Sequence, residues 1–249
     1  MKPTGFLVLT GLAACLHAGT LWGQPAAVQG QVAALQQTLQ KDEDRLKHYE
    51  WIETTYVNVK GKVVSRTQKR CIWGADGKLQ KILLTPSPAA KKRRGLAGWI
   101  VDKRKKELKD YIKSVVEMLK TYVPPDPASL QAAQDTGRVS LRVTQPGARV
   151  RLEFRDYHRV GDRLGVEMDP TDHHIVGMTV STYMAYPKDT VTLNVRFATL
   201  PDGTGYPAQA TLDAKTRKTQ VTVENSYLRP RERTQELSGT PSANTQRQP

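Results

Sequence analysis

Basic side chains are concentrated in one segment of the sequence, between residues 91 and 113. Three carboxylates, Asp102, Glu107 and Asp110, interrupt this segment, which therefore carries a large excess of positive charge. Like charges this close repel one another unless an anionic partner or counterions screen them, and each basic group near an anionic membrane surface contributes about 1 kcal/mol. We interpret the segment as a basic patch that meets an anionic group, with a solvated helix face as the alternative. The side chains of this basic patch are Lys91, Lys92, Arg93, Arg94, Lys103, Arg104, Lys105, Lys106, Lys109 and Lys113.

Residues 1–23 have the features of a signal peptide. Lys2 supplies a positive charge, and the apolar stretch 6–14 is too short to span a bilayer core of about 30 Å. The stretch from Leu12 to Cys15 resembles the lipobox of bacterial lipoproteins, which implies cleavage between residues 14 and 15 and lipidation of Cys15. Ordinary cleavage near Gly23 is the alternative. Both routes predict an exported protein of the periplasm or outer membrane, with membrane association that is peripheral or through a lipid anchor.

The whole chain is basic as well, with a formal net charge of +14 and a pI near 9.8. Such a charge attracts polyanions, among them nucleic acid, anionic lipid head groups and acidic polymers of the cell surface. Nucleic acid is disfavoured, because Trp99 and Tyr111 within the basic segment do not form a repeated stacking platform and the signal peptide directs the chain out of the cytoplasm. We therefore expect a lipid or another anionic envelope component as partner, and no nucleic acid.

No constellation of residues predicts catalysis or cofactor binding. His173 and His174 stand near Asp172, but adjacent histidines point in opposite directions and lack the spacing of a metal motif, so a polar turn is favoured. A nucleophile elbow, a phosphate loop and a dinucleotide-binding glycine motif are all absent from the sequence. Cys71 shares the apolar register of its strand and is favoured as a small buried residue. We expect no enzyme, no metal and no cofactor.

Apolar periodicity predicts helices first and strands afterwards. Stripes at helical spacing predict helices over residues 28–49 and 100–122, and Asp126 is placed to cap a short third helix that ends near residue 134. Between residues 49 and 84, β-branched and aromatic runs separated by glycine turns predict three antiparallel strands.

Beyond Arg138 the period is two almost without interruption, which predicts a meander with one apolar and one polar face. The fold class is α+β, mostly β: a single curved antiparallel sheet, or half-open barrel, of about ten strands, covered by two or three helices. We expect one domain over residues 24–228 and a disordered tail over 229–249. The apolar face either lines a cavity that can hold an acyl chain or forms an ordinary filled core. The residues proposed for that cavity are Leu152, Phe154, Val166, Met178, Leu193, Val195 and Phe197.

This order of elements behind a signal peptide resembles the periplasmic Lol-type lipoprotein carriers. The resemblance covers roughly residues 28–227 and implies a half-open barrel that is closed by helices and holds acyl chains. The stretches 73–78 and 191–203 are similar to uncharacterised exported proteins called lipoprotein-sorting-like. No position matches a carrier motif, so no functional residue is transferred.

Two hypotheses follow from these patterns. In the first, a monomeric envelope protein binds a hydrophobic or amphipathic anionic ligand, with the sheet taking the apolar part and the basic patch the anionic group. In the second, a non-catalytic scaffold or adaptor with a solid core docks on anionic polymers, a membrane or a protein partner through the same basic patch. An apolar cavity of several hundred Å³ that opens beside residues 91–113 favours the first hypothesis, whereas a sheet face fully occupied by the second helix favours the second hypothesis.

Overall fold

The computed structural model of the protein describes residues 24–84 and 96–231. The predicted signal peptide with Cys15, the first four residues of the basic patch (Lys91, Lys92, Arg93 and Arg94) and the predicted tail beyond residue 231 lie outside the described residues.

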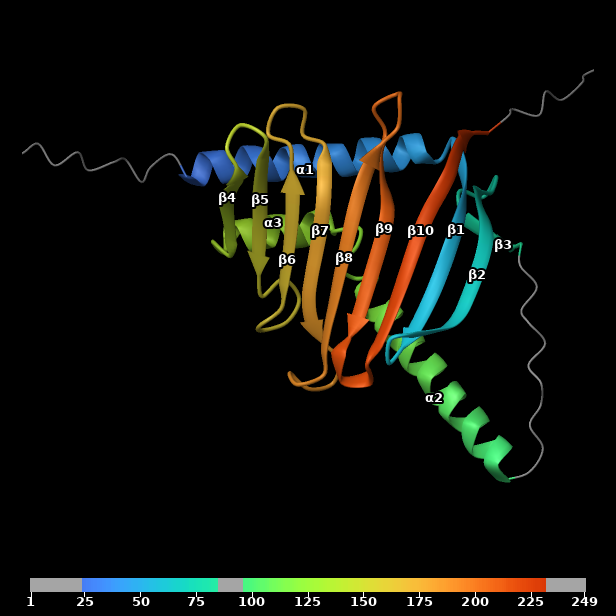
Figure 1. Cartoon of the computed structure of the whole chain (residues 1–249). Helices are drawn as coiled ribbons and strands as arrows, with labels where there is room; N and C mark the ends of the chain where they lie inside the picture. The colour runs from blue at the N-terminus through green and yellow to red at the C-terminus, as the bar shows by residue number, and fades with distance from the viewer. Residues whose placement is uncertain (1–23, 85–95, 232–249) are drawn as a thin grey trace, which may run out of the picture.

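Ten antiparallel strands form one continuous open sheet, which confirms the predicted fold class (Figure 1). The strand order is β3-β2-β1-β10-β9-β8-β7-β6-β5-β4, so the predicted meander runs from β4 to β10 and the first strand then pairs with the last. β3 and β4 are the two edges. The strands are β1 (Tyr49–Val59), β2 (Lys62–Trp73), β3 (Leu79–Leu83), β4 (Val139–Gln145), β5 (Arg149–Arg155), β6 (Arg163–Met168), β7 (Ile175–Tyr183), β8 (Thr190–Thr199), β9 (Gly205–Ala214) and β10 (Thr219–Pro230).

Side-chain alternation explains most of these strands. In β8, for example, Val191, Leu193 and Val195 are buried, whereas Asn194 and Arg196 between and after them are exposed. β9 was not expected, because its sequence has few large apolar residues to mark the period of two. Its neighbours β8 and β10 on either side supply the pairing that fixes it as a strand.

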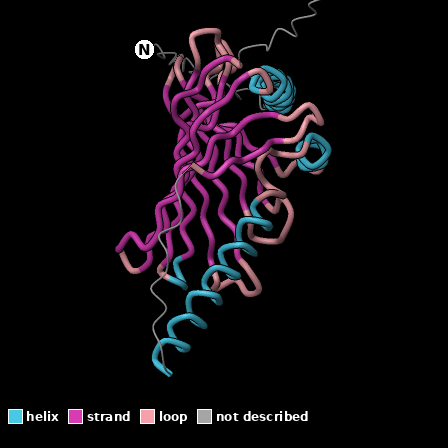
Figure 2. The backbone as a smooth tube through the Cα atoms, turned by 90° about the vertical axis from the view of Figure 1, so that its right-hand side faces the viewer, coloured by secondary structure: helices cyan, strands magenta, loops and turns pink. Residues whose placement is uncertain are grey.

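Three helices lie on one face of this sheet: α1 (Gln24–Leu46), α2 (Leu96–Leu119) and α3 (Pro127–Asp135). Figure 2 shows α1 and α3 end-on, next to each other on the same side of the strands. The predicted cap of the third helix is present, since Asp126 Oδ2 accepts a hydrogen bond from Ser129 N at 2.8 Å. The first helix ends at Leu46, earlier than residue 49, because Tyr49 already pairs within the sheet.

α2 contributes to the cover of the apolar face with its C-terminal half, from Tyr111 to Leu119. Val115 and Leu119 are buried in the core, whereas Lys103–Glu107 are exposed. Figures 1 and 2 both show the N-terminal part of α2 extending beyond the ends of the strands. The physical reason for the exposure of residues 103–107 is composition: all five are charged, and a charged surface gains nothing from burial.

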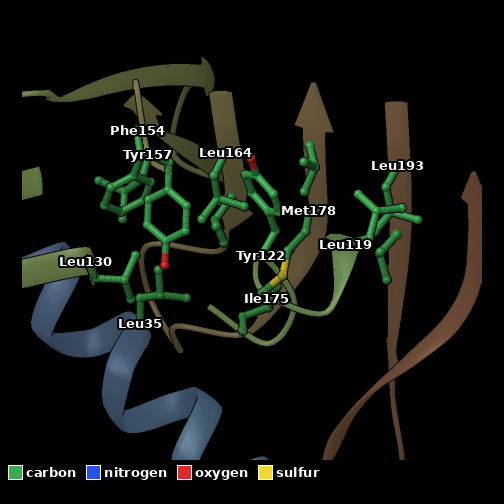
Figure 3. Packing of buried hydrophobic residues seen from close by; sticks show 14 of the residues in the cluster. Leu35, Leu119, Tyr122, Leu130, Phe154, Tyr157, Leu164, Ile175, Met178 and Leu193 are labelled. Atoms are coloured by element: carbon green, nitrogen blue, oxygen red, sulfur yellow. The ribbon is translucent and has the colours of Figure 1, made fainter. Parts of the chain in front are cut away.

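The core therefore forms between the sheet, α1 and α3, with the end of α2 at its margin. Figure 3 shows Leu35 of α1 and Leu130 of α3 directed toward Phe154 and Tyr157, and all four side chains are buried. Each large side chain of this kind contributes about 1.5–3 kcal/mol by leaving water.

A buried polar group anchors the chain after α2. Tyr122 Oη donates a hydrogen bond to Asp162 Oδ2 at 2.6 Å and lies 3.0 Å from Thr182 Oγ1. The same Asp162 oxygen accepts hydrogen bonds from the backbone N–H groups of His158 and Arg159. Burial and the nearby carboxylate raise the pKa of Tyr122 to about 12, so its hydroxyl stays protonated and remains a donor.

Candidate ligand cavity

The structure separates the seven apolar residues proposed for a cavity into two groups. Leu152, Phe154, Val166, Leu193 and Val195 are buried in the core cluster, packed by α1, α3 and the end of α2. Met178 on β7 and Phe197 on β8 line a cavity, and Met178 belongs to the buried core cluster as well. The apolar face of the sheet thus provides both a filled core and a hollow, one beside the other.

The cavity has a volume of about 680 Å³ and lies between α1, the segment 123–127 and the strands around β1 and β10. Its wall combines the stripe of α1 with residues of β1, β2, β3, β7, β8, β9 and β10. The large apolar side chains on this wall are Leu39, Leu46, Trp51, Trp73, Leu79, Ile175, Met178, Phe197 and Leu228. This volume falls within the range of roughly 300–1,000 Å³ that is typical of small-molecule sites, and the lining has their apolar character.

The apolar residues of this wall were only partly predicted from the sequence. Leu39 and Leu46 belong to the helical stripe that predicted α1. Trp51 on β1 and Trp73 on β2 were not predicted to line a cavity. No local pattern indicates that these N-terminal strands share a sheet face with the C-terminal strand β10. Pairing of β1 with both β2 and β10 brings them to the cavity.

Carboxylates, rather than basic groups, occur among the polar residues of the cavity wall. Asp42, Glu43 and Asp126 line it together with Gln36 and Gln40. Asp42 is buried, and its Oδ1 accepts a hydrogen bond from Gly205 N at 3.0 Å. Burial, opposed by this hydrogen bond, raises the pKa of the Asp42 carboxyl above its usual range. The cavity wall itself is therefore poorly suited to an anionic group.

The end of α1 is fixed to the turn between β8 and β9. A Cβ at Gly205 would lie 2.4 Å from Asp42 Oδ2, so this close approach of helix and strand requires glycine. Arg45 donates to the Asp202 carbonyl oxygen at 3.3 Å, and Tyr49 Oη donates to the Asp202 carboxylate at 2.8 Å. These contacts hold the α1 wall of the cavity in place.

The basic patch does not reach this cavity. Its described members lie on α2 and are exposed, and none of them is among the residues that line the cavity: Lys103, Arg104, Lys105, Lys106, Lys109 and Lys113. Lys106, Lys109 and Lys113 follow one another at helical spacing on one side of α2. The patch and the cavity are thus separate surfaces.

Cys71, His173 and His174 are not among the residues that line the cavity. Cys71 is a buried free thiol, and burial raises its pKa to about 11. His173 adopts a left-handed conformation in a turn, with φ of 61°, and His174 N donates a hydrogen bond to Asp172 Oδ1 at 3.0 Å. Within residues 24–84 and 96–231, no group of three or more His, Cys, Asp or Glu side chains is arranged to hold a metal ion. Nor is any helix in that part of the chain long and apolar enough to cross a membrane.

The chain resembles several solved structures distantly, and two of them are described here. The chain is similar to a DUF1329 family protein from Desulfovibrio piger ATCC 29098, with a TM-score of 0.41, 12% identity and coverage of 82% of this chain and 92% of that one. It is also similar to a LolA superfamily protein from Nitrosomonas europaea, with a TM-score of 0.37, 11% identity and coverage of 80% and 94%. The second bears the name of the group that the element order resembles. A scan against protein-family models and a search of curated proteins found no match.

Proposed function

We propose that the protein binds a hydrophobic ligand, an acyl chain or a lipid, in the cavity between α1 and the sheet. The observation that carries this proposal is the 680 Å³ hollow itself, because it interrupts a face that is otherwise filled with packed side chains. Each methylene group that leaves water for such a wall contributes about 0.8 kcal/mol. A carrier or binding protein that the signal peptide exports to the cell envelope is the function these features support best.

Lipid that copurifies with the protein tests this proposal directly. The protein is to be purified from envelope fractions and its organic extract analysed by mass spectrometry. We expect an acyl-containing species in near-stoichiometric amount, absent from a parallel extract of a control envelope protein. Well-folded material that carries no lipid, and that does not bind an added fluorescent fatty-acid ester, contradicts the proposal.

The exposed basic side of α2 supports a second candidate, docking on an anionic surface. Lys106, Lys109 and Lys113 form a cationic stripe on the helix that extends beyond the sheet. This arrangement suits a membrane with anionic lipids, because basic side chains on a projecting helix can reach it without a change in the fold. Docking of this kind requires no cavity, so the two candidates can be tested separately.

A triple variant of α2 tests this second candidate. We expect Lys106→Gln, Lys109→Gln and Lys113→Gln together to weaken binding to phosphatidylglycerol-containing vesicles about tenfold or more, since each basic group contributes about 1 kcal/mol there. Vesicle cosedimentation at two salt concentrations measures the effect, and high salt is expected to abolish it. The matched control replaces the exposed Lys60, Lys62 and Lys78, which removes the same charge near the hairpin turns. Equal losses in both triple variants would point to net charge alone and rule out α2 as the docking element.

A further inference from the structure

Charged side chains continue the cavity wall along β1 and β3. Trp51, Trp73 and Leu79 line the cavity from β1, β2 and β3. Side chains two residues apart on a strand point to the same side of a sheet, so Glu53 shares the face of Trp51. By the same rule Lys81 shares the face of Leu79. The face that holds the cavity therefore becomes charged one step beyond the cavity wall.

Strand pairing adds a second lysine to this face. Residues directly opposite each other on paired strands share a face, and Glu53 lies opposite both Lys69 of β2 and Asn225 of β10. Asn225 lines the cavity, so Glu53 stands between the cavity wall and Lys69. We call Glu53, Lys69 and Lys81 the charged cluster.

The surroundings of Cys71 agree with this placement. Cys71 lies opposite Trp51 on one side and Lys81 on the other. Burial raises the pKa of its thiol most, the charge of Glu53 raises it further, and the charges of Lys81 and Lys69 lower it. All three members of the charged cluster therefore lie near this thiol, on the face that carries the cavity.

One positive charge of the cluster has no partner of opposite charge. Glu53 is only 8% exposed, and its Oε2 accepts a hydrogen bond from Lys81 Nζ. Within residues 24–84 and 96–231, the ammonium group of Lys69 makes no hydrogen bond or ion pair. Two ammonium groups thus face one carboxylate. Lys69 is half-buried and Lys81 is exposed, so a ligand can reach both of them.

The opposite side of the cavity carries negative charge. Asp42 and Glu43 line it from α1, and Asp126 lines it from the segment that precedes α3. An anionic group is repelled by ionised carboxylates and attracted by a surplus ammonium group. The charges around the cavity therefore direct the anionic end of a ligand away from α1 and toward β2 and β3.

We propose that Lys69 and Lys81 bind the carboxylate or phosphate of an amphipathic lipid whose apolar chain occupies the cavity. This inference rests on the proposed function and places the anionic group on β2 and β3, in contrast to the earlier expectation of the basic patch. One ligand can reach both sites, because the charged cluster and the cavity adjoin on the same face of the sheet.

Binding of cis-parinaric acid and of its methyl ester tests the proposal, because the two probes share a fluorescent chain and differ in charge. At alkaline pH we expect the wild-type protein to prefer the acid. Lys69→Gln is expected to weaken binding of the acid about threefold to fivefold, the effect of one partly exposed ion pair, while the ester binds as before. Arg66→Gln is the matched control, because Arg66 is an exposed basic residue of the same strand that points to the opposite face, over the Tyr56 ring.

A gain of affinity guards against misfolded variants. Glu53→Gln removes the competing negative charge but keeps the shape of the side chain, so we expect it to bind the acid about threefold more tightly. Equal losses in Lys69→Gln and Arg66→Gln would point to net charge alone and overturn the head-group site.

The two probes also separate this inference from the proposed function. If the ester and the acid bind wild type equally and no variant changes their ratio, the head-group site is wrong although the cavity proposal stands. If neither probe binds wild type, both proposals fail. Binding of inorganic phosphate that Lys69→Gln weakens, with binding of the acid unchanged, would identify a site for free anions and overturn the lipid assignment.

Discussion

Asp162→Ala is expected to lower the free energy of unfolding by about 4 kcal/mol. Asp162 is fully buried, and one of its oxygens accepts from the Tyr122 hydroxyl and from the N–H groups of His158 and Arg159. Alanine leaves all three donors in a dry environment without an acceptor, and each such donor costs about 1–3 kcal/mol. Loss of this group also releases Tyr122, which ties the end of α2 to β7 through Thr182.

Chemical denaturation by urea measures this loss, and Asp162→Asn is the matched control. The asparagine oxygen can still accept from the three donors, which all use the same Asp162 oxygen, so we expect a loss of only about 1–2 kcal/mol. Asp110→Ala on the exposed part of α2 is expected to change stability by less than about 0.5 kcal/mol. Equal stability of Asp162→Ala and Asp162→Asn would contradict the role assigned to the oxygen.

Leu39→Trp is expected to weaken binding of the methyl ester of cis-parinaric acid more than tenfold. Leu39 lies on α1, lines the cavity and packs against the core, so a larger ring at this position occupies space that the ligand needs. The ester is neutral, so its binding reports on the apolar wall of the cavity. Fluorescence titration measures the affinity.

Leu39→Ala provides the opposite change at the same site. It enlarges the cavity, and we expect the ester to remain bound with an affinity within about threefold of wild type, since the rest of the apolar wall is intact. A folded Leu39→Trp protein, judged by its near-ultraviolet circular dichroism, that binds the ester as wild type does would exclude this cavity as the binding site.

The sequence predicts the fold where side chains alternate and fails where pairing alone decides. Val191, Leu193 and Val195 identify β8 without any structure, because the period of two reflects one dry and one wet face. The sequence of β9 lacks this alternation of apolar and polar residues, and β9 is a strand because it pairs with β8 and β10 on either side.

The candidate site was predicted only in part, because it too depends on strand pairing that the local sequence does not reveal. Met178 and Phe197 were recognised as apolar sheet residues, but periodicity cannot distinguish a side chain that fills a core from one that faces a hollow. The ion pair between Glu50 and Arg229 could not be predicted at all, because the two residues stand near opposite ends of the chain and become partners only through the pairing of β1 with β10. The high density of positive charge in the basic patch instead predicted an anion-binding surface on α2.

The pairing of the first strand with the last also limits the order in which the chain can fold. Tyr49 has its partner at Pro230, so the three N-terminal strands cannot join the meander until almost the entire polypeptide has been released. Pairing between such distant segments requires closure of a very long loop, which slows folding and leaves one border of β1 unpaired in the meantime. A chaperone that covers this unpaired edge of β1 during synthesis or transport would prevent it from pairing with strands of other molecules. For the same reason, truncation before β10 should yield aggregated protein rather than a smaller stable domain.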